Sequence, residues 1–476
     1  MTQPNGREGG RAKGVSARRQ PHVRGARVAP ARRCAYAVLR RVFEQGAYAD
    51  RALQSEARDL DARDRALAMR LAYGAIQRRG TLDHLAECLA GRPAGQLDSP
   101  LLAALRLGLY ELLYLSGAPD HAVVADCVEL AKIHGSPTRG GHGLVNAVLR
   151  RAAREGTEAL LGALRDDTPE RAAVTHSHPE WIARLWWEEL GAPDARALMA
   201  ADNEPGELAL RVNTLAADPA TVAGEIAVLT HTDPELPEAL ILDGPFDLHG
   251  SGAWGSGAIL AQSRAAMLVA RVLDPQAGER VLDLCAAPGG KSTHMAALMG
   301  DQGEVLAVER NRARAAELRD TARRLHAQCV RVEISDATLP RPEGDVFDRV
   351  LVDPPCSGLG TLQARADLRW RVTPEQLSQM AETQATILTA GARALRPGGV
   401  LVYSTCTISP AENERQIELF LDRNPHFALD DLTNEQQIHT HPRMSKVLLT
   451  MPHRDHTAGF FIARIRRVDD APVGRL

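Results

Sequence analysis

Hydrophobic residues recur at three- and four-residue spacing through most of the first third of the chain. The segments with this spacing are 35–43, 64–77, 101–115, 122–133 and 144–153. Such spacing places the hydrophobic side chains on one face of a helix. We therefore predict an all-helical domain over residues 31–165, packed as a helical bundle.

The pattern becomes mixed over residues 166–254. Helical spacing continues to residue 200, and Pro179 suits the first turn of a helix. The segments 208–213 and 239–242 have the pattern of strands, and helical spacing returns over 218–229. This stretch predicts a helical linker followed by a small α+β subdomain.

Short apolar runs alternate with helical segments over residues 255–467. The predicted strands are 280–284, 304–308, 329–334, 348–352 and 400–404, and the predicted helices are 291–299, 311–326, 374–396 and 411–423. Alternation with buried strands predicts an α/β fold with a doubly wound, Rossmann-like parallel sheet. Two further strands, 446–451 and 459–465, are predicted to form an antiparallel hairpin at a sheet edge.

Charge is distributed unevenly along the chain. The whole protein has a formal net charge of −3, but residues 1–33 contain nine Arg or Lys residues and one Glu. We predict that residues 1–30 form a disordered basic arm. Such an arm can follow a phosphate backbone, and a solubilising tail or a misassigned start codon explains it equally well.

Composition excludes several classes of protein. No apolar run is long enough for a transmembrane helix, and the N-terminus lacks the apolar core of a secretory signal. The seven cysteines are scattered without a C-x-x-C pair, which argues against a zinc site and against a disulfide framework. We expect a cytoplasmic protein with no membrane association and no metal, and a monomer.

A glycine-rich turn follows the predicted strand 280–284. Its residues are Cys285, Ala286, Ala287, Pro288, Gly289, Gly290 and Lys291. A strand, such a turn and a helix are the layout of a nucleotide-type site. The turn lacks G-x-G-x-x-G, which weighs against a dinucleotide, and it has Cys285 where a P-loop needs its first glycine.

Acidic residues follow the neighbouring predicted strands. Glu309, Asp336 and Asp353 each stand just after a strand. An acid at such a position can accept hydrogen bonds from a ribose or from the amine of adenine, although a single one more often caps a helix. Acids in register at successive strand ends favour an adenosine-containing cofactor, and S-adenosylmethionine fits better than NAD.

Two cysteines also stand at predicted strand ends. Cys356 and Cys406 each follow an apolar run and have polar neighbours. Ligands bind beyond the carboxyl ends of parallel strands, so both thiols should reach one crevice with the cofactor loop. A lone cysteine is usually a small buried hydrophobe, but the polar neighbours favour reactive thiols. A thiolate that adds to C6 of cytosine makes C5 able to take a methyl group, and Asp353 is placed to stabilise the adduct at N3. Nothing in the pattern ranks the two thiols.

Three motifs resemble a known family. LDLCAAPGGKSTHMAALM, DPPCSGLGTL and VYSTCTISPAENE are similar to motifs of the RNA cytosine-5 methyltransferases of the Sun/Fmu (RsmB) group, in the RsmB/NOP family. The resemblance covers residues 205–467. HAVVADCVELAK and GLVNAVLRR resemble the NusB-type RNA-binding domain. Together these resemblances imply an S-adenosyl-L-methionine-dependent catalytic domain over 255–467 and a NusB-like domain over 31–165. They also imply a single-stranded or flipped cytosine of small-subunit ribosomal RNA as the substrate.

The resemblance also implies roles for single residues. Cys406 matches the catalytic nucleophile, Cys356 the cysteine that assists product release, and Asp353 the acid that faces both cytosine and cofactor. The loop from Cys285 to Lys291, with Glu309 and Asp336, matches cofactor contacts. Arg314 and Arg211 are weaker candidates, for cofactor and RNA respectively. Ser263 and Pro354 depart from the family pattern, where an acid and an alanine are common.

Three alternatives stay open. The substrate could be transfer RNA. The target could be an exocyclic amine, although Cys356 stands where an aromatic residue is typical of such enzymes. The protein could also be an inactive RNA-binding or antitermination module, although intact thiols and Asp353 argue against this.

Overall fold

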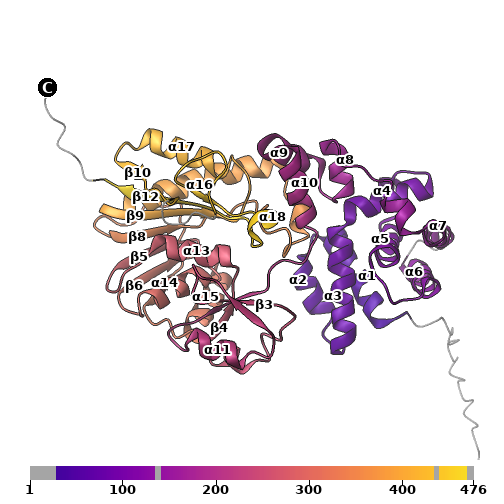
Figure 1. Ribbon diagram of the computed structural model, residues 1–476, viewed down its shortest axis with the longest axis horizontal. Helices are drawn as coiled ribbons and strands as arrows, with labels where there is room; N and C mark the ends of the chain where they lie inside the picture. The colour runs from indigo at the N-terminus through magenta and orange to yellow at the C-terminus, as the bar shows by residue number, and fades with distance from the viewer. Residues whose placement is uncertain (1–27, 135–140, 434–438, 469–476) are drawn as a thin grey trace, which may run out of the picture.

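The computed structural model describes residues 28–134, 141–433 and 439–468. Nearly all of the predicted basic arm lies outside these residues. A helical half and a half built on β-sheets lie side by side (Figure 1). Within the described residues, no helix is both long and apolar enough to cross a membrane.

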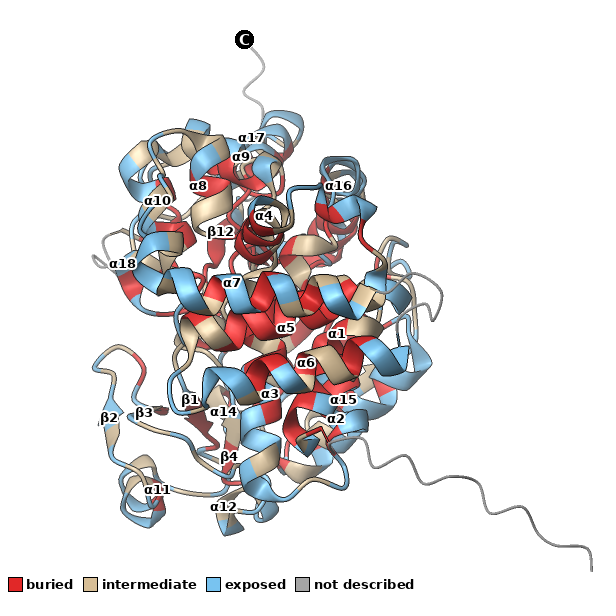
Figure 2. Ribbon diagram, turned by 90° about the vertical axis from the view of Figure 1, so that its right-hand side faces the viewer, coloured by how far each residue is buried: buried red, intermediate tan, exposed pale blue. Residues whose placement is uncertain are grey.

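The N-terminal half is all-helical, as predicted. Its helices are α1 (Pro30–Gln45), α2 (Ala49–Glu56), α3 (Ala62–Gln77), α4 (Arg79–Ala90), α5 (Ser99–Tyr114), α6 (Asp120–His134) and α7 (Gly141–Leu161). α5 is almost entirely buried among the others (Figure 2). A Cβ on Gly108 of α5 would lie 2.6 Å from Leu149 and 3.1 Å from Cys127, so only glycine permits this close approach of α5 to α6 and α7.

Three helices connect this domain to the rest: α8 (Pro169–Thr175), α9 (Glu180–Leu190) and α10 (Ala192–Ala201). Trp186 of α9 is fully buried, and its indole N–H donates a hydrogen bond of 3.2 Å to the Ile408 carbonyl. Ile408 belongs to the half of the protein that contains the predicted catalytic domain, named the catalytic half. The linker is therefore packed onto the catalytic half.

The small subdomain contains a four-stranded antiparallel sheet in the order β2-β3-β1-β4. Its strands are β1 (Ala209–Val212), β2 (Thr230–Thr232), β3 (Ala239–Leu242) and β4 (Ile259–Ala261). Because β4 pairs with β1, the predicted boundary at residue 254 falls inside this sheet. The predicted helix over 218–229 is too long, since α11 (Pro219–Glu225) ends before the short strand β2.

The catalytic half contains an eight-stranded sheet. Its strands are β5 (Arg280–Leu284), β6 (Glu304–Val308), β7 (Val330–Glu333), β8 (Phe347–Val352), β9 (Leu395–Thr405), β10 (Phe427–Leu429), β11 (Leu448–Leu449) and β12 (Phe461–Arg467), in the order β10-β12-β9-β8-β5-β6-β7 with β11 on β12. The run β9-β8-β5-β6-β7 is parallel, as predicted. β11 and β12 pair antiparallel, but β12 lies between β9 and β10, so the predicted hairpin is not at the edge. The edge strand β10 has only three residues, too few for a period-two pattern to predict.

Alternate residues of the central strands face different helices. Leu282, Val350 and Val352 pack in the core that includes α16 (Pro374–Ala394) and α17 (Glu414–Arg423). Val281 and Leu351 pack in the core that includes α13 (Arg264–Leu273) and α14 (Gly290–Leu298). Helices thus cover both faces, α15 (Arg312–Arg324) among them (Figure 1), and the predicted doubly wound sheet is confirmed.

Candidate active site

The parallel strands bring the predicted site residues to one edge of the sheet. Leu284, Val308 and Val352 end β5, β6 and β8, and the loops that follow them begin side by side. β9 ends at Thr405 beside these loops. Segments that lie far apart in the sequence therefore meet where an α/β sheet binds its ligands.

The two predicted thiols lie in contact. The sulfur atoms of Cys356 and Cys406 are 3.3 Å apart, a hydrogen-bond distance for sulfur, and no disulfide joins them. The Gly360 N–H donates to the Cys406 carbonyl over 3.0 Å, which fixes the two cysteine loops against each other. This edge of the sheet thus contains a preformed pair of thiols.

The surroundings distinguish the two sulfurs. The hydrogen bond from Cys356 lowers the pKa of Cys406, burial and the Asp353 carboxylate oppose this, and the positive charges of Lys291 and Arg365 lower the pKa further. The same hydrogen bond raises the pKa of Cys356, and burial and the Glu412 carboxylate add to this. Cys406 is therefore the sulfur that ionises first, with the Cys356 S–H as its hydrogen-bond donor.

Lys291, the last residue of the predicted cofactor loop Cys285–Lys291, forms an ion pair near the thiols. Its ammonium donates to the Asp353 carboxylate over 2.7 Å and lies 5.0 Å from the centre of the Phe460 ring. Burial lowers the pKa of Lys291, but the Asp353 carboxylate more than offsets this, and the net pKa is raised. Lys291 thus stays protonated beside Cys406.

Glu412 holds the Cys356 loop, and sequence analysis missed it. Its fully buried carboxylate accepts from the Ser357 backbone N–H over 2.8 Å, from the Ser357 hydroxyl, and from the Gln384 amide over 3.0 Å. Gln384 also donates to the Pro355 carbonyl over 2.9 Å. Glu412 stood at the start of a predicted helix and had the appearance of an exposed first-turn acid. It precedes α17 and points inward instead.

The turn between β5 and α14 has an unusual backbone. Cys285 has a φ of 67° and Gly289 a φ of 101°, and a Cβ on Gly289 would lie 3.2 Å from Leu318. The hydroxyl of Ser292 donates to Asp283 over 2.6 Å beneath the turn. Burial raises the pKa of Asp283 to about 7 and that of the Cys285 thiol to about 12. Cys285 is therefore a neutral lining residue and not a nucleophile.

The two predicted cofactor acids follow β6 and β7, the next two strands of the sheet. The Glu309 carboxylate accepts from the Asn311 N–H over 2.8 Å and lies 3.4 Å from Arg314, which donates to the Ala287 carbonyl over 2.6 Å. One oxygen of Asp336 accepts two hydrogen bonds from Thr338, which lower its pKa. The other Asp336 oxygen can accept from a ligand. An acceptor set at successive strand ends, beside the first turn of α14, fits an adenosine-containing cofactor.

The weaker candidate Arg211 and the departure at Ser263 have structural explanations. Arg211 has no exposed surface, and its guanidinium donates to Gln262 over 2.7 Å, to the Gly290 carbonyl over 2.5 Å and to Thr293 over 2.9 Å. The expected RNA contact of Arg211 is therefore wrong, because its side chain ties β1 to the first turn of α14. Ser263 caps α13 by accepting from the Ala266 N–H over 3.3 Å, so the departure from an acid at this position keeps a capping oxygen.

Within the described part of the chain, no group of three His, Cys, Asp or Glu side chains could hold a metal ion.

Comparisons with known proteins agree with this architecture. The family described as 16S rRNA methyltransferase RsmB/F matches residues 270–466, the NusB family matches 29–154, and the ferredoxin-like domain of RsmF/B-like methyltransferases matches 178–249. The chain is 37% identical to a probable ribosomal RNA small subunit methyltransferase B of Synechocystis, over 92% of this chain and 99% of that protein. It is 33% identical to a probable ribosomal RNA small subunit methyltransferase B of Bacillus subtilis, over 90% and 97%.

Solved structures share the fold. The crystal structure of PH0851 aligns with a TM-score of 0.78 at 27% identity, over 93% of this chain and all of that one. The structure of NSun6 from Pyrococcus horikoshii with SFG, an S-adenosylmethionine analogue, aligns with a TM-score of 0.54 at 25% identity, over 61% and 97%.

Proposed function

Because the chain belongs to the RsmB/F family of 16S rRNA methyltransferases, which use S-adenosylmethionine, we propose that it methylates C5 of a cytosine in small-subunit ribosomal RNA through a covalent adduct at C6. One observation carries the proposal. A low-pKa thiol, Cys406, lies 3.3 Å from a second thiol, Cys356, and near the Lys291–Asp353 pair. Methylation of an exocyclic amine needs neither thiol, whereas addition and elimination at a pyrimidine ring need a nucleophile and a base.

The first step is addition. The Cys406 thiolate forms a bond to C6 of the cytosine, and the electron pair of the C5–C6 double bond becomes available at C5. The ring then needs a proton at N3. The Lys291–Asp353 pair, whose nitrogen and oxygen atoms are 2.7 Å apart, can donate that proton to N3. S-adenosylmethionine, when bound, supplies the methyl group that C5 takes.

The second step is elimination. Once the Cys406 sulfur is bonded to carbon, its hydrogen bond with Cys356 and its negative charge are lost, and both of these raise the pKa of Cys356. Cys356 can then lose its proton to water and take the proton from C5. The bond between the Cys406 sulfur and C6 breaks, the C5–C6 double bond forms again, N3 returns its proton to the Lys291–Asp353 pair, and Cys406 leaves as a thiolate.

The cofactor is held, in this proposal, by the turn from Cys285 to Lys291 and by the two acids beyond the neighbouring strands. Glu309 would accept from the ribose and Asp336 from the adenine amine. Arg314 acts as a positioning residue, because it binds the Ala287 carbonyl and faces Glu309.

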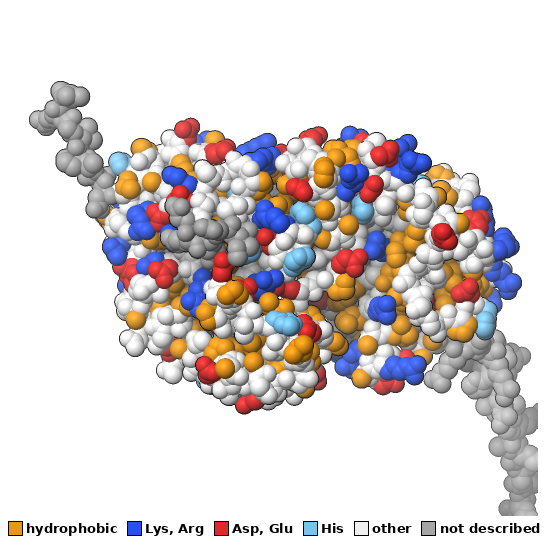
Figure 3. All heavy atoms as spheres, in the orientation of Figure 1, with side chains coloured by type: hydrophobic (Ala, Val, Ile, Leu, Met, Phe, Trp, Pro, Cys, Tyr) orange, Lys and Arg blue, Asp and Glu red, His pale blue; other side chains and the backbone are white. Residues whose placement is uncertain are grey.

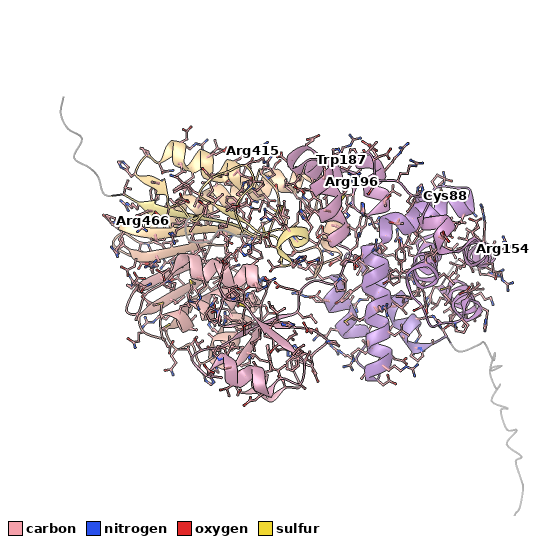
Figure 4. All side chains as sticks on the ribbon, in the orientation of Figure 1. Cys88, Arg154, Trp187, Arg196, Arg415 and Arg466 are labelled. Atoms are coloured by element: carbon pink, nitrogen blue, oxygen red, sulfur yellow. The ribbon has the colours of Figure 1, made fainter. Side chains whose placement is uncertain are left out.

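The experiment uses an unmodified small-subunit rRNA transcript and radiolabelled S-adenosylmethionine, followed by bisulfite sequencing. We expect Cys406→Ala to abolish methyl transfer and Cys356→Ala to accumulate an RNA–protein adduct that survives a denaturing gel. Cys88→Ala is the control, because Cys88 is exposed on α4 in the helical domain (Figure 4). Full activity of Cys406→Ala, with no adduct for Cys356→Ala, would contradict the mechanism. The same assay with transfer RNA tests the alternative substrate.

A further inference from the structure

A cavity of about 530 Å³ lies where the helical domain meets the catalytic half. The helical domain supplies Phe43, Tyr48 and Arg79 to its lining, and the catalytic half supplies Cys356 and the segment 365–380. Cys406, Lys291 and Asp353 do not line it. The cavity therefore adjoins the thiol pair through Cys356 and lies apart from the cofactor turn. The surface is also hollowed between the two halves in Figure 3.

Hydrogen bonds fix the two walls of this cavity to each other. The Trp370 indole donates to the Ile76 carbonyl of α3 over 2.8 Å. The Arg371 guanidinium donates to the carbonyls of Gly46 and Ala47 over 2.8 Å and 3.1 Å. These hydrogen bonds thus hold the two walls of the cavity in a fixed position at the junction of the two domains.

Its lining combines cations with aromatic rings. The Arg371 guanidinium lies 4.2 Å from the centre of the Tyr48 ring, and Arg79 lies 4.8 Å from the Phe43 ring and 5.1 Å from the Trp370 ring. Tyr48 remains 42% exposed. Arginine planes and aromatic faces are the surfaces on which proteins stack unpaired bases and bind their phosphates.

The charge of the lining favours an anion. Arg79, Arg365 and Arg371 face the cavity, and Asp367 is the one carboxylate in its lining, only 6% exposed. Arg365 is exposed, and its Nη1 lies 4.0 Å from the position that a Cβ on Gly358 would take, two residues from Cys356. The guanidinium of Arg365 therefore lies beside the loop that carries the second thiol.

We propose that this cavity binds the nucleotide next to the target cytosine, and that the helical domain thereby forms part of the substrate site. The proposal rests on the proposed function. A base at the thiol pair must be single-stranded or flipped out of a helix. The nucleotide next to it in the RNA chain must therefore lie against the protein surface beside the thiols. The cavity begins at Cys356 and offers the guanidinium groups of Arg365 and Arg371 to the phosphate of this nucleotide. It offers the ring of Tyr48 and the plane of the Arg371 guanidinium to the base of the nucleotide.

The kinetic test compares variants on the unmodified small-subunit rRNA transcript. We expect Arg365→Gln and Tyr48→Ala each to raise KM about tenfold, as the loss of one phosphate or stacking contact predicts. We expect kcat to stay unchanged in Tyr48→Ala and to fall in Arg365→Gln, which also loses a positive charge near Cys406. Loss of a phosphate contact should also reduce the slope of log KM against log salt by about 0.7 for Arg365→Gln. Tyr48→Phe keeps the ring and should behave like the wild type, which would show that the contact needs the ring and not the hydroxyl. Arg154→Gln is the control, because Arg154 projects from α7 at the far end of the helical domain (Figure 4).

A crosslinking test locates the nucleotide. Tyr48 is replaced by p-azidophenylalanine in the Cys356→Ala background, and reverse transcription maps the crosslink relative to the methylated cytosine. We expect a stop within one or two nucleotides of that cytosine. A covalent adduct without a nearby crosslink, together with an unchanged KM for Arg365→Gln, would overturn the cavity proposal alone. Absence of methylation by the wild type on this transcript would instead overturn the proposed function.

Discussion

Asp283 is a buried carboxyl group under the cofactor turn, and its replacement by asparagine should stabilise the protein in a pH-dependent way. It is 1% exposed, and its Oδ1 has no hydrogen-bond partner, while Oδ2 accepts from Ser292. Burial raises its pKa from 3.8 to about 7. Because the pKa of the folded state is raised, the contribution of Asp283 to stability is complete below about pH 4 and is lost as the pH rises to about 7.

The expected change in the free energy of unfolding follows from the shift in the pKa of Asp283. About three pKa units at 1.36 kcal/mol each correspond to a cost of about 4 kcal/mol once the group is ionised in both states. At about pH 5.5 a little more than half of this cost is already present, so about 2 kcal/mol is added between about pH 5.5 and 8.5. Asp283→Asn has no charge to bury, and its side-chain oxygen can take the place of Oδ2 and accept from Ser292. The difference between its free energy of unfolding and that of the wild type should therefore increase by about 2 kcal/mol from about pH 5.5 to about pH 8.5.

Urea unfolding at the two pH values measures this difference. The transition of the catalytic half is identified by its shift to higher urea concentration when S-adenosylmethionine is added. Asp320→Asn is the control, because the Asp320 side chain is 71% exposed on α15 and should show no such growth. An advantage of Asp283→Asn that is the same at both pH values would refute the reasoning, because it would mean that Asp283 does not titrate in this range.

Two further predictions concern the thiol site. Lys291→Met should raise the pKa of Cys406, since a nearby positive charge is lost, and should shift the pH dependence of its alkylation by iodoacetamide to higher pH. Lys446→Met, at an exposed position, should leave that profile unchanged, and an unshifted profile in Lys291→Met would mean that Lys291 does not stabilise the thiolate. Glu412→Gln should reduce kcat about tenfold with little change in KM, because a carboxamide cannot accept both hydrogen bonds from Ser357 and also that from Gln384 with the same strength. Wild-type kcat in the methyl-transfer assay would show that the Cys356 loop keeps its position without this anchor.

Much of the fold follows from local patterns. The three- and four-residue spacing predicted the helical domain, and the alternating strands and helices predicted the parallel sheet. Both succeed because the periods of helices and buried strands are properties of a few consecutive residues. The position of both thiols at strand ends follows from the same patterns, since parallel strands bring their carboxyl ends to one edge.

The features that the sequence analysis missed or got wrong depend on residues that are distant in the sequence. The edge strand β10 and the strand β4 have three residues each, and they are strands only because β12 and β1 pair with them. Arg211 had the appearance of a free cation, but its burial comes from contacts with Gln262, Gly290 and Thr293. No local pattern contains such contacts.

By itself, the sequence determined that two cysteines, a glycine-rich turn and three acids would gather at one edge of a doubly wound sheet. Only the tertiary structure decided how the two thiols differ. Their pKa values depend on which charges lie near each sulfur, and Lys291, Arg365 and Glu412 reach them from three separate segments. Electrostatic interactions depend on distance in space and on burial, and neither is fixed until the chain has folded.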